Sequence, residues 1–77
     1  MDNRERIIAI VRKVSGKTDG PDPEESLFDS GFLDSFALTE VVADLEREFG
    51  IKIPDSDLNP RKFESIARIQ TYIESRM

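Results

Sequence analysis

The sequence predicts an all-α protein: a small four-helix bundle of three long helices and one short helix, with a long loop between the first and second helices. Three stretches repeat apolar residues at three- and four-residue spacing, which is the period of an amphipathic helix. Glycines follow the first two stretches, where a helix commonly ends. At 77 residues the chain has room for one modest core. We therefore expect residues 1–77 to form a single domain.

The first helix is expected from about Asp2 to Ser15. Asp2 and Glu5 have the spacing of a capping box, with Asp in place of Ser or Thr. Gly16 can adopt the left-handed conformation that ends a helix. The apolar residues that share one face of this helix are Ile7, Ile10, Val11 and Val14.

The loop runs from Lys17 to Asp34. Gly20, Pro21 and Pro23 break regular structure in it, and loops of this length are usually functional or disordered. Apolar residues near its end indicate that it is ordered and attached to the core. These residues are Leu27, Phe28, Phe32 and Leu33.

The second helix is expected from about Ser35 to Phe49, before Gly50. Its apolar stripe comprises Leu38, Val41, Val42, Leu45 and Phe49.

The short helix is predicted at Pro60–Phe63, because Asn59 can cap it and proline suits its first position. The last helix should run from about Ser65 to Ser75. Its inward residues are predicted to be Ile66, Ile69, Ile73 and Met77. An acyl chain could be sheltered by Phe49, Phe63, Ile66 and Ile69, although apolar residues at helical spacing are usually core.

The absence of Cys and His excludes a disulfide framework, a Cys/His zinc site and a His-based nucleophile relay. A calcium-binding loop fails on spacing, because Gly31 as its sixth residue would put Phe28 at a ligand position. Scattered carboxylates form no acid–base constellation, so we expect no catalytic residue, no metal and no enzyme. No apolar stretch is long enough for a signal peptide or a membrane span. We expect a cytoplasmic monomer.

The net charge of −5 is unevenly distributed. Residues 19–48 carry ten carboxylates against Arg47 alone, a sum of −9, so the remainder is +4. This acidity argues against nucleic acid as a partner and suits a protein with Lys and Arg around its binding site. The alternative is a solvated acidic face that serves only solubility.

Ser35 and its neighbours form the candidate site. A serine at a helix start is more often an N-cap than a modified residue, and Asp34 is an equally good cap. A phosphodiester attached to Ser35 would nevertheless meet the free N–H groups and the positive end of the helix dipole. Phe36 falls about 160° from the buried stripe, nearly opposite the core. With Glu40 on the same outward side and Asp44 at its edge, the pattern indicates a docking surface.

Residues 29–36, Asp-Ser-Gly-Phe-Leu-Asp-Ser-Phe, resemble the phosphopantetheine attachment motif of acyl and peptidyl carrier proteins. That motif has a glycine a few residues before an Asp-Ser pair, and a bulky apolar residue follows. Residues 46–54 and 57–66 resemble the second-helix end and third-helix region of the same family, so the similarity covers essentially the whole chain. Phe36 departs from the commoner leucine, although phenylalanine does occur, notably in stand-alone carriers that include D-alanyl carriers.

The resemblance implies a 4′-phosphopantetheine arm, taken from coenzyme A and attached to Ser35, that holds an acyl or aminoacyl group as a thioester. The implied partners are a phosphopantetheinyl transferase, an adenylate-forming acyl or aminoacyl ligase, and downstream acyl transferases or synthases. Partner recognition would rest on Asp34, Phe36, Glu40 and Asp44. The cargo stays open among fatty acid, polyketide and nonribosomal peptide biosynthesis. The competing interpretation is a small acidic helical adaptor for protein–protein interaction that has no prosthetic group.

Overall fold

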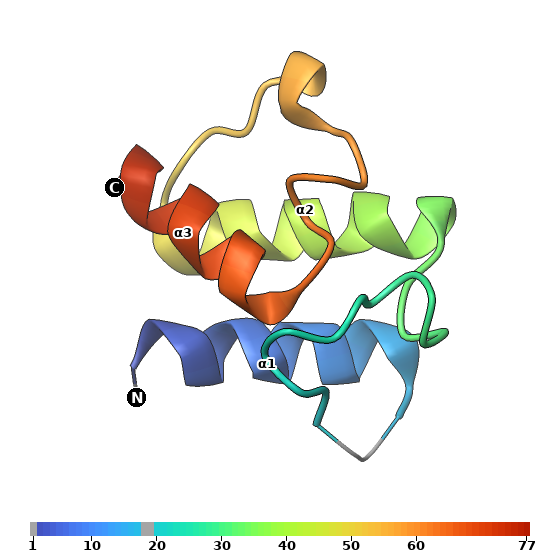
Figure 1. Ribbon diagram of the computed structural model, residues 1–77. Helices are drawn as coiled ribbons and strands as arrows, with labels where there is room; N and C mark the ends of the chain where they lie inside the picture. The colour runs from blue at the N-terminus through green and yellow to red at the C-terminus, as the bar shows by residue number, and fades with distance from the viewer. Residues whose placement is uncertain (1, 18–19) are drawn as a thin grey trace.

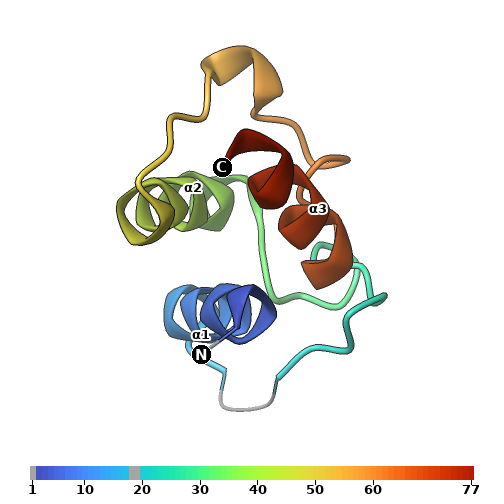
Figure 2. The same ribbon diagram turned by 90° about the vertical axis from the view of Figure 1, so that its left-hand side faces the viewer.

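The computed structural model describes residues 2–17 and 20–77. Three α-helices form the framework: α1 (Asn3–Ser15), α2 (Ser35–Phe49) and α3 (Ile66–Arg76). Helices α1 and α2 run antiparallel side by side, and α3 crosses one side of this pair (Figure 1, Figure 2). Helix α1 packs against both α2 and α3. The all-α prediction is confirmed.

Local hydrogen bonds and glycine conformation mark the helix ends, as predicted at Asp2 and Gly50. Asp2 Oδ1 accepts a hydrogen bond from the Glu5 N–H at 2.8 Å and caps α1. Ser65 Oγ accepts one from the Arg68 N–H at 3.2 Å and caps α3. Gly50 ends α2 at a φ of 65°, a left-handed conformation that glycine adopts without strain. These ends therefore need no tertiary contact to be specified.

The core lies where the apolar stripes of the three helices meet. All three helices contribute side chains with no exposed surface, and the long loop adds Leu27 to them. Backbone hydrogen bonds also attach the loop to the segment before α3, since the Leu27 N–H donates to the Glu64 carbonyl at 2.7 Å. The Ala67 N–H likewise donates to the Pro23 carbonyl at 3.0 Å. The prediction that apolar residues hold this loop on the core is confirmed.

The predicted helix at Pro60–Phe63 is wrong. Asn59 does accept the expected capping bond, from the Lys62 N–H at 3.1 Å, but only turns follow it. The helix cannot continue because Ser65 must be extended (φ −140°, ψ 166°) to cap α3. A 3₁₀ helix, η1 (Asp55–Asp57), is instead the short helical element of the described chain. Residues 2–17 and 20–77 thus form three α-helices, without the fourth, short α-helix that was predicted for the bundle.

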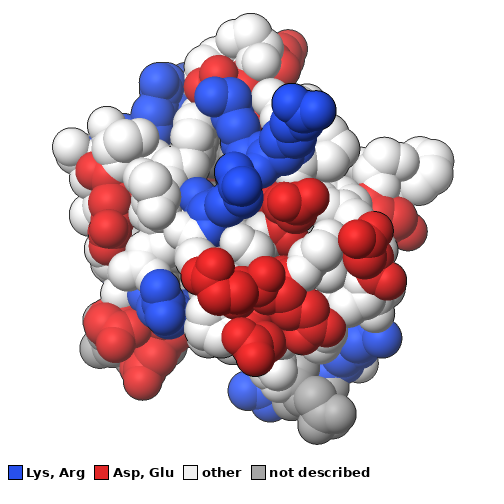
Figure 3. All heavy atoms as spheres, viewed as in Figure 1, with Lys and Arg blue, Asp and Glu red and all other residues white. Residues whose placement is uncertain are grey.

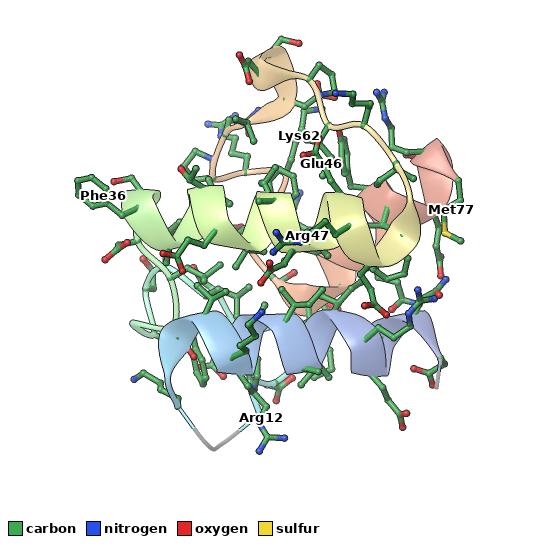
Figure 4. The ribbon with its side chains drawn as sticks, turned by 180° about the vertical axis from the view of Figure 1, so that it is seen from behind. Arg12, Phe36, Glu46, Arg47, Lys62 and Met77 are labelled. Carbon is green, nitrogen blue, oxygen red and sulfur yellow. The ribbon has the colours of Figure 1, made fainter. Side chains whose placement is uncertain are left out.

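Two ends of the predicted apolar stripes also differ. Met77 was expected inward, but it follows the last residue of α3 and its side chain is 65% exposed (Figure 4). Ile73 is the last buried residue of α3, and Met77 lies one turn further on, where the helix has ended. Phe49 is only partly buried, and its ring stacks under the Arg6 guanidinium at 4.2 Å.

Within residues 2–17 and 20–77, no helix combines the length and apolar character that a bilayer span requires. The same residues bring together no group of three or more side chains suited to hold a metal ion.

Candidate functional site

Ser35 is the first residue of α2, and it lies exposed between two buried anchors. Leu33, on the loop side, is buried, and its N–H donates to the Leu27 carbonyl at 2.9 Å. Leu38, one turn into the helix, is buried as well. The serine hydroxyl is therefore presented to solvent from a backbone that is fixed on both sides.

Asp34 caps α2, because its Oδ1 accepts a hydrogen bond from the Ala37 N–H at 2.8 Å. The capping role that the sequence allows for Asp34 is confirmed, and its role in partner recognition stays a prediction. The first intrahelical bond runs from the Leu38 N–H to the Asp34 carbonyl at 2.9 Å. The N–H groups of Ser35 and Phe36 precede that bond, so they are free to meet a phosphate oxygen.

Gly31 supplies the sharp turn before the site. Its φ of 85° lies in the left-handed region, and its N–H donates to the Phe28 carbonyl at 3.3 Å. A Cβ at this position would meet only the Lys17 ammonium, at 3.9 Å. The glycine is required by backbone conformation and not by lack of space.

We expect Gly31→Ala to lower the free energy of unfolding by about 1 kcal/mol, the cost of a left-handed conformation for a residue with a Cβ. Gly20→Ala is the matched control, because its φ is not left-handed and its Cβ would make an ordinary 3.7 Å contact with Ile8. Urea denaturation of both variants measures the difference. Equal effects would show that the Gly31 conformation is not the cause.

The outward placement predicted for Phe36 is confirmed. Its side chain is 84% exposed and points away from the bundle at the start of α2 (Figure 4). Glu40, one turn further along, is also exposed. A large exposed aromatic ring beside an exposed serine has the character of an interface anchor.

Asp44, predicted at the edge of the outward side, is half-buried. Its side chain is only 11% exposed and forms ion pairs with Lys13 (3.3 Å) and Arg47. Burial works to raise the pKa of Asp44, but the hydrogen bonds and positive charges of Arg47 and Lys13 outweigh it and leave the pKa below its ordinary value. The carboxylate is neutralised inside the molecule and offers little charge to a partner.

This pKa shift makes a pH-dependent contribution to stability. Because the folded-state pKa of Asp44 is lowered, its contribution is complete above the unfolded value of about 3.9 and is lost as the pH falls through the folded value. We expect Asp44→Asn to be less stable than the wild type at neutral pH, with the gap closing in acid. Urea unfolding at a series of pH values measures this gap. A gap that stays constant into acid would contradict the assigned ion pairs.

Other carboxylates of α2 are engaged as well. Glu48 pairs with Arg6 at 2.8 Å, and Glu46 accepts the Ile53 N–H at 2.8 Å. Among the described residues, Glu40 is the carboxylate of α2 without an ion-pair or hydrogen-bond partner on its side chain. The charge available to a partner on α2 is therefore smaller than the sum over residues 19–48 suggests.

A hollow of about 270 Å³ opens beside Ser35. The residues that line it with Ser35 are Phe28, Leu38, Thr39, Leu58 and Pro60. The sequence interpretation did not place these residues at the site. Thr39 could have been found by its i+4 spacing from Ser35, but Leu58 and Pro60 reach the site only through the tertiary fold.

The residues considered for sheltering an acyl chain do not line this hollow. Phe63, Ile66 and Ile69 are completely buried in the packed core, and Phe49 lies at its edge. A larger hollow of about 650 Å³ lies along α3, away from Ser35. On that face Figure 3 shows basic and acidic side chains in adjoining clusters. Lys62, Arg68, Glu24 and Glu64 are among the residues that line the larger hollow.

A family model described as "Phosphopantetheine attachment site" matches residues 5–73. The chain belongs to the phosphopantetheine-binding carrier protein family. Its relatives include the D-alanyl carrier protein of Leuconostoc mesenteroides, 31% identical over 97% of this chain and 96% of that protein. The acyl carrier protein of Thermotoga maritima is 34% identical over 100% of this chain and 99% of that protein. The D-alanyl carrier protein of Lactobacillus acidophilus is 27% identical over 97% of this chain and 95% of that protein.

The resemblance inferred from residues 29–36 is therefore confirmed at the level of the family. Carriers of this kind hold a covalent 4′-phosphopantetheine, whose terminal thiol forms the thioester, and they are not enzymes themselves. The surroundings of Ser35 suit such an arm: an exposed hydroxyl, a helix N-terminus for the phosphate, and an apolar hollow for the part next to it.

Proposed function

We propose that Ser35 carries the 4′-phosphopantetheine arm and that this carrier, residues 1–77 as one domain, holds an acyl or aminoacyl group for delivery to partner enzymes. The observation that supports it best is the exposed Ser35 hydroxyl at the start of α2, fixed between buried Leu33 and Leu38. Attachment consumes coenzyme A. The Ser35 oxygen bonds to phosphorus, the pyrophosphate bond breaks, adenosine 3′,5′-bisphosphate leaves, and the hydroxyl proton passes to a base of the transferase.

The cargo that we propose is a short acyl or aminoacyl group. Several relatives are D-alanyl carrier proteins, and the hollow beside Ser35 is small. Loading would then come from an adenylate-forming ligase, and delivery would go to an acyl transferase or synthase. We propose that the carrier acts as a cytoplasmic monomer.

Intact-mass measurement tests the attachment. The protein is incubated with coenzyme A and a promiscuous phosphopantetheinyl transferase, and the expected product gains the mass of one phosphopantetheine. A protein that stays unmodified while a known carrier is converted in the same mixture would contradict the proposal. That outcome would favour the adaptor without a prosthetic group.

We propose that the recognition surface consists of Phe36 and Glu40, with Asp34 at its edge and Asp44 contributing little. Phe36 provides exposed apolar area, and Glu40 provides a charge that no described residue neutralises. Asp34 is exposed, but its carboxylate is already used as a cap.

Glu40→Lys should slow the association of a basic partner at low ionic strength, because it reverses an exposed charge on α2 close to Ser35. The expected change is about tenfold in the apparent on-rate of a phosphopantetheinyl transferase. It should shrink with added salt, since exposed charges are screened beyond about 8 Å at physiological ionic strength. Glu74→Lys, on α3, is the control and should change the rate far less. Rates indifferent to both salt and Glu40→Lys would show that the acidic residues serve only solubility and that docking rests on Phe36 and its apolar neighbours.

A further inference from the structure

The hollow beside Ser35 has two walls of different origin. One wall is α2 itself, through Leu38 and Thr39. The other is the irregular segment after η1, through Leu58 and Pro60. Figure 1 shows this segment arching away from the helices, with η1 at its top. The α2 wall is held in place by the buried stripe of that helix. The Leu58–Pro60 wall must be held by contacts of its own with the rest of the protein.

The irregular wall has little buried surface of its own. No residue of η1 is buried, and Leu58 is only partly buried. The attachment comes through Asp57, the residue next to Leu58, whose Oδ2 accepts a hydrogen bond from the Tyr72 hydroxyl at 2.5 Å. Tyr72 lies on α3, where its ring packs edge-to-face on the fully buried Phe63, with 5.3 Å between ring centroids.

Two cations complete this attachment. Lys62 and Arg76 each lie 3.9 Å from a carboxylate oxygen of Asp57. They also approach the Tyr72 ring, at 5.7 and 5.8 Å from its centroid. Burial, followed by the hydrogen bond to Asp57, raises the pKa of Tyr72 to about 12, so the hydroxyl stays protonated and donates its hydrogen bond at neutral pH.

The position of Leu58 sets the size of the hollow. A neighbouring hollow of about 620 Å³ lies further along α2, and Thr39 and Leu58 line both. Val42 and Ile53, both buried, contribute apolar surface to the second hollow. Outward movement of Leu58 would join the two hollows into one longer groove along α2.

We infer that the Tyr72–Asp57 pair positions the Leu58–Pro60 wall and thereby limits the group that can be sheltered beside Ser35 to a short one. The inference rests on the proposed attachment at Ser35. Tyr72 and Asp57 are positioning residues, because they act on the hollow through Leu58 and Pro60 and do not line it.

The first test uses hydrogen exchange in the unmodified protein. The N–H groups of Leu58 and Asn59 donate to the carbonyls of Asp55 (3.0 Å) and Asp57 (2.9 Å), so they report on the wall. Tyr72→Phe removes only the hydroxyl and keeps the ring. We expect the hydrogen-exchange rates of the Leu58 and Asn59 N–H groups to rise about fivefold, because losing one hydrogen bond changes an opening equilibrium by about that factor. The exchange rates of α1 should not change.

Gln70→Ala is the matched control, because it removes a 2.7 Å hydrogen bond between Arg4 and α3 and leaves the wall alone. It should leave exchange at Leu58 unchanged. Unchanged exchange at Leu58 in Tyr72→Phe, or an equal rise in α1, would overturn the positioning role. This test needs no arm, so it decides the role of the pair even if Ser35 proves unmodified.

The second test measures sheltering directly. The wild type and Tyr72→Phe are each loaded from acetyl- and octanoyl-coenzyme A by a promiscuous transferase. Hydroxylamine then cleaves the thioesters. The chain contains no cysteine, so the thiol released belongs to the arm alone. In the wild type we expect similar cleavage rates for the two cargoes. In Tyr72→Phe the octanoyl thioester should be cleaved about fivefold more slowly than the acetyl thioester.

The limit on cargo length would be overturned if the octanoyl thioester of the wild type were already cleaved more slowly than the acetyl thioester. Equal cleavage rates for the two thioesters in Tyr72→Phe would overturn it as well. A failure to gain mass on Ser35 would instead overturn the proposed function. The two failures are thus distinguished within one set of samples.

Discussion

Ser35→Ala should abolish the gain of phosphopantetheine mass and leave the helical circular dichroism signal nearly intact. The chemistry disappears because no other hydroxyl occupies this position at the start of α2. The fold survives because Asp34, and not Ser35, caps the helix through the Ala37 N–H. Intact mass and circular dichroism of the same sample measure both halves of the prediction.

Two other serines provide strict controls, because each also follows an aspartate. Ser30 lies in the turn before Gly31, and Ser56 lies inside η1. Neither has a long helix beginning at it, so Ser30→Ala and Ser56→Ala should gain the full mass. A mass gain that persists in Ser35→Ala would move the attachment site elsewhere.

Phe36→Ala should reduce the rate of modification and loading by about tenfold, the effect typical of an aromatic interface anchor. Its effect on the free energy of unfolding should stay within about 0.5 kcal/mol, because the ring is 84% exposed and packs on little. Transferase kinetics and urea denaturation measure the two effects separately.

Met77→Ala is the control for loss of an exposed apolar side chain, since Met77 is 65% exposed and lies after α3. It should change neither the rate nor the stability. If Phe36→Ala unfolds the protein, the ring is a core residue. If it leaves the rates unchanged, recognition rests on other residues of this face.

The candidate site was largely predictable because its determinants are local. Asp34 caps α2 through a residue three positions away, and the left-handed turn at Gly31 is closed by a hydrogen bond to Phe28, also three positions away. The outward direction of Phe36 follows from the helical phase of the buried stripe. The motif at residues 29–36 therefore carried enough information to indicate both the exposed serine and the family.

Other features depended on residues far apart in the sequence. The charge of Asp44 is offset partly by Lys13, which lies on a different helix at 3.3 Å. The contact between Asp44 and Lys13 cannot be read from a spacing, whereas the i,i+3 pair with Arg47 can. The Pro60–Phe63 segment differs for a nearer reason: it has a good helix start but forms only turns, because Ser65, two residues beyond it, is extended to cap α3.

By itself, the sequence determined the three α-helices, the caps at Asp2 and Asp34, the exposed Ser35 and the family. The tertiary structure decided which charges are neutralised, where the irregular wall lies and how large the hollow beside Ser35 is. Capping and helical phase act over about one turn, so the chain encodes them locally. Ion pairs and hollows form between segments such as η1 and α3, whose contact at Tyr72 and Asp57 exists only after the helices have packed.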